Sequence, residues 1–319
     1  MNVTRLPSKR REFLELHIEA VDVSYVSALR RIAQADVPVL AIDHLEVIRN
    51  DTSYDDTYLL HRFGLLTINS DYASRVLFQL DCTCRCIDEN CAECRSGKVN
   101  ERKKHKCAKR CPSCSVEYRL HIRNDTPLVS REQLAYTHRV IECSDPRFQF
   151  NCLYADTARE TAAYFAHDGL PEEAFDFQLL SLGPGQELEV RMYARKAIGY
   201  ANAKWSCARA WFSNRPRIQA PESGRAAITE CPNGAYTYSN DMEDFTRLEP
   251  ERCVRCGICE DPKVHKGSAS ESMRIDELPE SFDFHLQALG QLPPESILQQ
   301  SAAILVEKIE NIMKAFSVY

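Results

Sequence analysis

The sequence lacks the features that mark several specialised classes of protein. It contains no run of eighteen apolar residues, which excludes a conventional transmembrane helix. Only 11 of its 319 residues are glycine and 15 are proline, which argues against a collagen-like or broadly disordered chain. The first twenty residues hold no apolar core of the kind found in secretory signals. We therefore expect a protein of a reducing compartment, the cytosol or the nucleus.

The chain also has little excess charge. It carries 40 Lys and Arg against 46 Asp and Glu, a formal net charge of −6. This acidic balance argues against a protein whose main task is to coat nucleic acid or an anionic membrane. Hydrophobic residues make up 44% of the chain, enough to bury real cores, and the length suggests two or three domains.

The hydropathy pattern predicts a mixed α+β fold. Strands are expected where apolar and polar residues alternate or β-branched residues gather, at 13–20, 37–48, 75–81, 115–123, 187–195 and 281–288. Helices are expected at 24–35, around 54–63, and at 295–316, where apolar residues follow three- and four-residue steps. The polar segments 214–224 and 262–272 are interpreted as linkers that bracket a small inserted module.

Fifteen cysteines are the most unusual feature of the composition. In a reducing compartment, clustered cysteines are more often metal ligands than disulfides. Eight lie between Cys82 and Cys114, and four form a second group near residue 250. The remaining three are interpreted as small buried hydrophobic residues: Cys143, Cys152 and Cys207.

The first cluster is predicted to bind one or two zinc ions at the tip of a hairpin formed by strands 75–81 and 115–123. Eight thiolates match two closed tetrahedral sites, and closed four-ligand sites are structural rather than catalytic. One partition joins Cys82, Cys84, Cys111 and Cys114, and separately Cys86, Cys91, Cys94 and Cys107, with His105 as a substitute ligand. A second partition joins Cys84, Cys86, Cys91 and Cys94, and separately Cys82, Cys107, Cys111 and Cys114.

The tip of this loop is strongly basic. Residues 95–110 contain eight Lys and Arg and one Glu, a charge of +7. Two interpretations remain open, a solvated loop or a surface that docks onto an acidic partner or a nucleic-acid backbone. No aromatic residue lies among these charges to stack on bases, which favours the solvated loop.

The second cluster has the C-x2-C-x2-C spacing of bacterial-type ferredoxins. Those proteins continue with x3-C-P, but here no cysteine follows, and a Cys-Pro pair lies upstream instead. The predicted ligand set is therefore Cys231, Cys253, Cys256 and Cys259. This set indicates either one 4Fe–4S cluster or a further zinc ion, because four thiolates suit both metals.

Four ordered motifs resemble those of a known family. They are residues 28–32 (ALRRI) with 37–43 (VPVLAID), 60–65 (LHRFGL), 203–206 (AKWS) and 282–293 (FDFHLQALGQLP). Together they resemble the α-like assembly subunit of multisubunit RNA polymerases. This family includes the bacterial alpha subunit, its archaeal counterpart and the third-largest subunit of eukaryotic RNA polymerase II. Phe63 departs from the aliphatic residue of the family motif.

The resemblance implies a three-part architecture. A discontinuous dimerisation domain, with a sheet and two main helices, would comprise 1–47, 174–222 and 268–319. An inserted β-rich domain, 48–173, would carry the zinc loop 82–114. A ferredoxin-like cysteine module would occupy 223–267.

The resemblance also implies a function without catalysis. The chain would pair with a smaller homologous subunit and form a platform for the two large catalytic subunits and a small zinc-binding subunit, meeting DNA only through the complex. Such a subunit belongs in the nucleus of a eukaryote, the cytoplasm of an archaeon, or the host cell or virion of a large DNA virus. The implied interface residues are Leu29, Arg30, Arg31, Arg62, Lys204, Trp205, Leu305, Ile309 and Ile312.

Other interpretations remain open at this stage. Both helical stripes could pack within the chain, and the three arginines could be paired internally or solvated. Two other functions compete, an iron–sulfur electron-transfer protein and a zinc-loop nucleic-acid-binding protein. The absence of a G-x-G-x-x-G fingerprint between a strand and a helix argues against a dinucleotide partner for electron transfer.

Overall fold

The computed structural model describes residues 1–8, 10–82, 113–125, 139–142, 148–149, 178–239 and 244–316. Its contacts divide the chain into two compact units, each built from distant segments. Unit 1 contains Met1–Arg31 and Ala210–Gln287, and unit 2 contains Ile32–Arg209 and Ala288–Tyr319. Within the described residues, no helix is long and apolar enough to cross a membrane.

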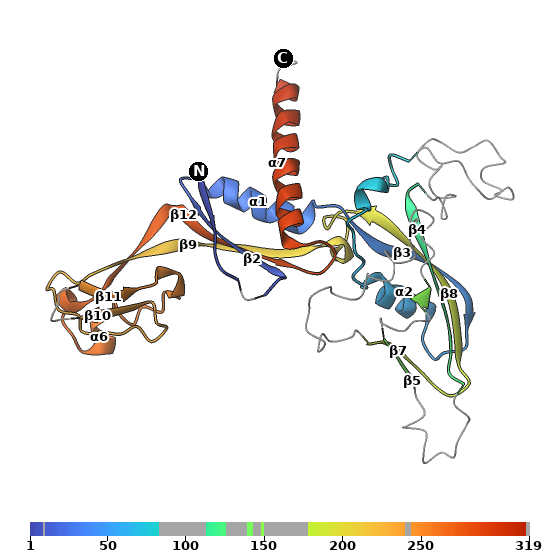
Figure 1. Ribbon diagram of the computed structural model, residues 1–319, viewed down its shortest axis with the longest axis horizontal. Coiled ribbons are helices and arrows are strands. Elements are labelled where there is room, and N and C mark those ends of the chain that lie inside the picture. The colour runs from blue at the N-terminus through green and yellow to red at the C-terminus, as the bar shows by residue number, and fades with distance from the viewer. Residues whose placement is uncertain are drawn as a thin grey trace, which may run out of the picture. The chain divides into compact units, whose positions relative to one another are not determined.

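Unit 1 is organised around a four-stranded sheet with the order β1-β2-β12-β9. Strand β2 (Phe13–Glu19) pairs antiparallel with β1 (Asn2–Arg5) and with β12 (Arg274–Ala288), and β9 (Ala208–Gln219) forms the far edge. Leu14, Leu16 and Ile18 alternate with polar residues and are all buried. Helix α1 (Val23–Ala35) follows β2 and lies alongside this sheet in Figure 1. The alternating pattern of 13–20 is thereby confirmed.

A small module follows β9 within unit 1. It contains the hairpin β10 (Tyr236–Ser239) and β11 (Asp244–Leu248), the 3-10 turns η5 (Pro250–Arg252) and η6 (Ala269–Glu271), and the short helix α6 (Pro262–His265). Its core is compact and contains two of the cysteines. The buried residues are Ile218, Ala226, Cys231, Ala235, Tyr236, Tyr238, Cys259 and Met273.

Unit 2 contains a second sheet, with the order β3-β8-β4-β6. Its strands are β3 (Val39–Asn50), β8 (Glu187–Ala197), β4 (Ser115–Arg123) and β6 (Phe148–Gln149). A separate pair joins β5 (Arg139–Glu142) to β7 (Gln178–Leu182). The unit also contains α2 (Asp56–Gly64), the 3-10 turns η1 (Ala73–Arg75) and η4 (Ala203–Trp205), and the C-terminal helix α7 (Pro294–Phe316).

Local capping explains where α2 begins. The Asp55 carboxylate accepts a hydrogen bond from the backbone N–H of Thr57 at 2.8 Å, which satisfies one donor of the first turn. The helix therefore begins two residues later than the 54–63 pattern suggested. Its buried residues, Leu59 and Phe63, join the core beneath β3, β8 and β4.

The predicted strand 75–81 is wrong. This segment contains η1 and then irregular backbone, and β4 pairs with β8 and β6 instead. Val76 is buried in the core of unit 2, whereas Leu77 and Leu80 are exposed, so the segment has no continuous buried strand face. The segment meets the returning chain through a hydrogen bond from Leu77 N–H to the Ser113 carbonyl at 2.9 Å, without forming a ladder. The predicted hairpin is therefore absent from the described residues.

The predicted linker 214–224 is wrong over its first half, because β9 continues to Gln219 through Pro216. A proline lacks the N–H of a strand ladder, but β9 is an edge strand and has one side without a neighbour. The second linker, 262–272, contains α6 and η6. The three-part domain division stays a prediction, because most of 83–177 lies outside the described residues.

Candidate functional site

The second cysteine group converges on the core of the small module. Cys231 and Cys259 are buried, Cys253 is partly buried against the same core, and Cys256 is exposed. The loop that carries the last three turns sharply, with Arg255 at φ 52° and Gly257 at φ 75°. Glycine suits the second position because a side chain is strained at positive φ. Two separate loops thus bring three thiols to one core, and the exposed fourth thiol, Cys256, lies in the second loop.

The pKa shifts of Tyr236 and Cys259 agree with neighbouring thiols around the core of the module. Burial raises the pKa of Tyr236, and the thiols of Cys259, Cys231 and Cys256 raise it further. Burial also raises the pKa of Cys259 to about 11, with Glu260 and Cys253 contributing and a hydrogen bond from Tyr236 opposing. Tyr236 therefore lies within electrostatic reach of three of the four thiols, and its hydroxyl also donates a hydrogen bond to the Ile228 carbonyl at 3.3 Å.

The donor chemistry fits a thiolate-binding metal centre, but the side-chain positions do not form a closed ligand set. Among the described residues, no group of three or more His, Cys, Asp or Glu side chains is arranged to hold a metal ion. No disulfide joins the seven described cysteines either. The metal prediction thus rests on sequence spacing and on the convergence of three of the four thiols.

Most of the first cluster lies outside the described residues. Cys82 and Cys114, at the two ends of the loop, are both buried in unit 2. The part of the chain that the structure describes does not include Cys84, Cys86, Cys91, Cys94, His105, Cys107, Cys111 or the basic tip 95–110. The zinc partition and the role of the tip therefore stay predictions.

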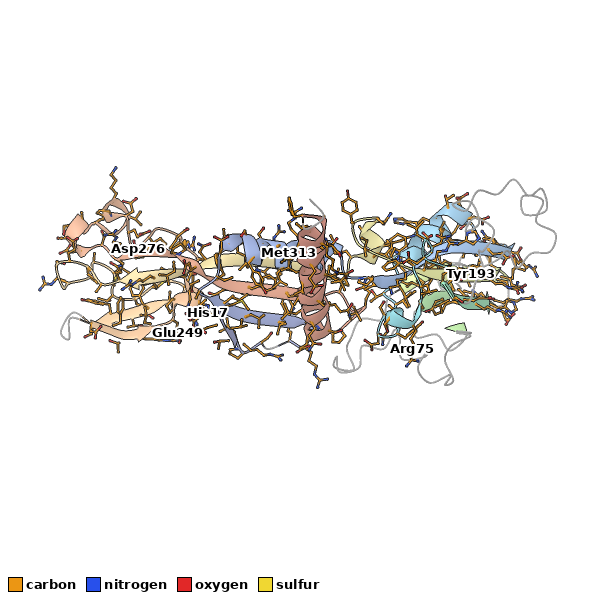
Figure 2. All side chains as sticks on the ribbon, turned by 90° about the horizontal axis from the view of Figure 1, so that it is seen from above. His17, Arg75, Tyr193, Glu249, Asp276 and Met313 are labelled. Carbon is orange, nitrogen blue, oxygen red and sulfur yellow. The ribbon has the colours of Figure 1, made fainter. Side chains whose placement is uncertain are left out.

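Helix α7 presents an apolar surface to solvent. Only Pro294, Ile297 and Ser301 are buried, all in its first eight residues. Leu298 and Leu305 are partly buried, and the apolar residues of the later turns are exposed. This surface, the α7 stripe, contains Val306, Ile309, Ile312, Met313 and Phe316, which are 48–77% exposed. Figure 2 labels Met313 on this part of the helix.

The predicted interface residues of α1 and α2 lie in different surroundings. Leu29 is buried within the chain, so intramolecular packing accounts for it. Arg30 is partly buried and Arg31 is exposed. Arg62 is partly buried, and its Nη2 donates a hydrogen bond to the Leu179 carbonyl at 3.4 Å.

The motif 203–206 forms an internal anchor in unit 2. Lys204 Nζ lies 2.6 Å from Asp43 Oδ1, and it donates a hydrogen bond to the Ile42 carbonyl at 3.3 Å. The same ammonium lies 4.3 Å from the centre of the Trp205 ring. Trp205 is buried, and its indole N–H donates to the Arg195 carbonyl at 3.0 Å. The motif thereby joins η4 to β3 and β8.

Asp43 connects the two cations of this anchor. Its carboxylate also lies 3.1 Å from Arg195 Nη1. Burial alone would raise the pKa of Asp43, but the hydrogen bonds and charges of Lys204 and Arg195 outweigh it and hold the pKa below the usual 3.8. The sequence analysis identified Lys204 but did not identify Asp43 or Arg195 as members of this ion-pair network. The signal was available, because Asp43 is the one acidic residue in the motif 37–43.

The family described as the RNA polymerase Rpb3/Rpb11 dimerisation domain matches residues 15–309, most of the chain. The chain belongs to this family. The resemblance inferred from the four motifs is confirmed, and with it the prediction of a polymerase assembly subunit rather than an electron-transfer protein. The mixed α/β organisation agrees with this membership.

Relatives of this Rpb3/Rpb11 family member come from eukaryotes and archaea. RNA polymerase II subunit rpb3 of Dictyostelium discoideum is 25% identical, covering 97% of this chain and 95% of the relative. Subunit 3 of RNA polymerases II, IV and V from Arabidopsis thaliana is 29% identical, covering 94% and 87%. Subunit Rpo3 of Methanosphaera stadtmanae is 23% identical, covering 93% and 92%. The similarity thus extends over nearly the whole chain.

Proposed function

We propose that this chain is a non-catalytic assembly subunit of a DNA-directed RNA polymerase that pairs through α7 with a smaller homologous subunit. The observation that carries the proposal is the α7 stripe, in a chain whose family is described as a dimerisation domain. The pair would form the platform for the two large catalytic subunits and a small zinc-binding subunit. DNA would be reached only through the complex.

Covering the α7 stripe would contribute a measurable part of the binding free energy. Burying an isoleucine side chain fully contributes roughly 1.5–3 kcal/mol. Ile309 and Ile312 are 48% and 56% exposed, so covering both would contribute about half of that each. Together they account for roughly 2 kcal/mol, or about thirtyfold in affinity. Three further apolar residues flank them, and Phe316 has the largest exposed fraction.

The test is a two-residue variant of this stripe. Ile309→Ser/Ile312→Ser should weaken association with the co-expressed smaller subunit by about thirtyfold or more, because serine removes the apolar contact and adds a hydroxyl to be desolvated. Affinity can be measured by titrating the purified subunits. The control is Asn311→Ser/Lys314→Ser, which changes two exposed residues on the other side of the same helix. Equal affinity of wild type and the isoleucine variant would refute pairing through α7.

We also propose that the four thiols of the module hold one metal centre, a 4Fe–4S cluster or zinc, and that the 82–114 loop holds one or two zinc ions. Convergence of Cys231, Cys253 and Cys259 on one core supports the first centre, and Cys256 lies in the same loop as Cys253 and Cys259. A bound metal would stabilise a module whose own apolar core is small.

The proposed location follows from the proposed complex. The named relatives are polymerase subunits of eukaryotes and archaea. The chain would work in the nucleus of a eukaryotic cell or the cytoplasm of an archaeal one, and in the host cell or virion if it is viral. Imaging of a tagged chain, together with nuclear counterstaining, would test the eukaryotic case.

A further inference from the structure

A groove of about 270 Å³ lies on the face of the unit 2 sheet that points away from the core. It is lined by residues of three neighbouring strands, Ile48 from β3, Arg119 and His121 from β4, and Glu189 and Arg191 from β8. In β4 the alternate residues Val116, Tyr118, Leu120 and Ile122 fill the core, so Arg119 and His121 project outward. Nothing in the proposed polymerase function depends on this groove.

Two guanidinium groups meet in the groove. Arg119 of β4 stands directly opposite Arg191 of β8 in the antiparallel register. Like charges placed opposite each other across a ladder are destabilising unless another group neutralises them. Tyr193 of β8, labelled in Figure 2, lies in the same sheet and marks the position of this ladder. The arrangement is therefore one that a bound anion would relieve.

Internal carboxylates neutralise this pair incompletely. The Nε of Arg119 donates to Glu117 at 2.8 Å, while the contact from Arg191 Nη1 to Glu46 is 3.9 Å. The Nε of Arg191 is buried and has no hydrogen-bond partner among the described residues. A buried guanidinium donor without a partner is costly, and a carboxylate accepts two such donors at once.

We propose that this groove binds a carboxylate side chain from an acidic segment of another protein. Glu189 is part of the lining, and Glu46 and Glu117 flank the groove. These acids would repel the closely spaced phosphates of a nucleic-acid backbone. A single carboxylate can be placed between the guanidinium groups of Arg119 and Arg191, which attract it, and it brings no second negative charge next to these acids. Ile48, which is 45% exposed, offers an apolar wall for the neighbouring part of the segment.

The test places a photocrosslinking amino acid at Ile48 in the full chain, within its native complex. The crosslinked peptide, identified by mass spectrometry, should contain Asp or Glu, and the double variant Arg119→Gln/Arg191→Gln should lower its yield by about tenfold. The control is Arg247→Gln, which removes an exposed arginine that is paired with Glu249 in the other unit. Each variant is also checked by urea unfolding, because replacing two opposed like charges should not destabilise the sheet.

Several outcomes would overturn the proposal. They are a crosslink to nucleic acid, a crosslinked peptide without acidic residues, no crosslink at all, or a yield that the arginine variant leaves unchanged. A crosslinked acidic segment from a protein outside the polymerase, with a yield that falls in the arginine variant, would support carboxylate binding by this groove. That result would not bear on pairing through α7, which the Ile309→Ser/Ile312→Ser variant tests separately.

Discussion

Replacing Lys204 with methionine should destabilise unit 2 by removing the closest cation of Asp43. Lys204 Nζ lies 2.6 Å from the carboxylate, and the side chains of Lys204 and Asp43 are only 17% and 29% exposed. Methionine keeps the approximate length and apolar stem, so contact with the Trp205 ring is largely retained. The substitution therefore isolates the loss of charge at a partly buried site.

The size of the effect follows from this intermediate burial. Exposed ion pairs contribute about 0.2–1 kcal/mol, whereas removing one partner of a fully buried pair costs about 3–5 kcal/mol. Arg195 remains 3.1 Å from Asp43 and still neutralises part of its charge. We therefore expect a loss of about 2 kcal/mol in the free energy of unfolding, which is about thirtyfold in the equilibrium constant.

The assay is urea unfolding of the full chain at pH 7, with Lys204→Met, Asp43→Asn and the double variant as a thermodynamic cycle. The double variant should be less destabilised than the sum of the single variants, because they break the same interaction. Additive single effects, or a Lys204→Met chain as stable as wild type, would refute the claim that this motif is an internal anchor.

Four further predictions concern Asp43, Gly199, His17 and Cys256. Because the pKa of Asp43 is lowered in the folded chain, its ion pairs stabilise the fold above pH 3.8, and the wild-type advantage over Asp43→Asn should shrink as the pH falls below that value. Gly199→Ala should cost about 1–3 kcal/mol in urea unfolding, because a Cβ there would lie 2.7 Å from the Gln34 carbonyl oxygen; unchanged stability would contradict this close approach. His17→Leu should cost about 3 kcal/mol in the same assay, since buried Asp283 loses a partner at 2.8 Å, and His17→Leu/Asp283→Leu should recover part of it. Cys256→Ala should remove one metal centre, which elemental analysis of the anaerobically purified chain would detect. Cys207→Ala changes a buried cysteine outside the cluster and should leave the metal content unchanged.

The fold was predictable where one face of an element is buried. Leu14, Leu16 and Ile18 alternate because a core covers one side of β2, and the alternation alone located the strand. The strand-like composition of 75–81 led to a wrong prediction, because Val76 is buried whereas Leu77 and Leu80 face solvent and the segment joins no sheet. Pro216 led to the opposite error, a linker predicted where a strand lies. A proline indicates a linker unless the strand is known to lie at the edge of a sheet. Sheet order depends on pairing between segments far apart in the sequence.

The candidate sites were predictable only in part for a related reason. The spacing of Cys253, Cys256 and Cys259 indicated a metal centre, to which the Cys-Pro pair added Cys231, and this ligand set stays a prediction. The partners of Lys204 were missed, because Asp43 is 161 residues away and only the fold brings it within 2.6 Å. The apolar residues of α7 were visible as a stripe, but their exposure follows from where the other segments of unit 2 pack.

The most direct test of the proposed assembly role is the composition of the complex that contains this chain. A tagged chain should be purified from its native cells and the stoichiometry of the bound proteins measured by quantitative mass spectrometry. We expect one smaller homologous subunit and both large catalytic polymerase subunits per tagged chain, and a lower recovery of all three with the Ile309→Ser/Ile312→Ser variant. Recovery of the chain alone, or of a complex without the large subunits, would contradict the assembly role.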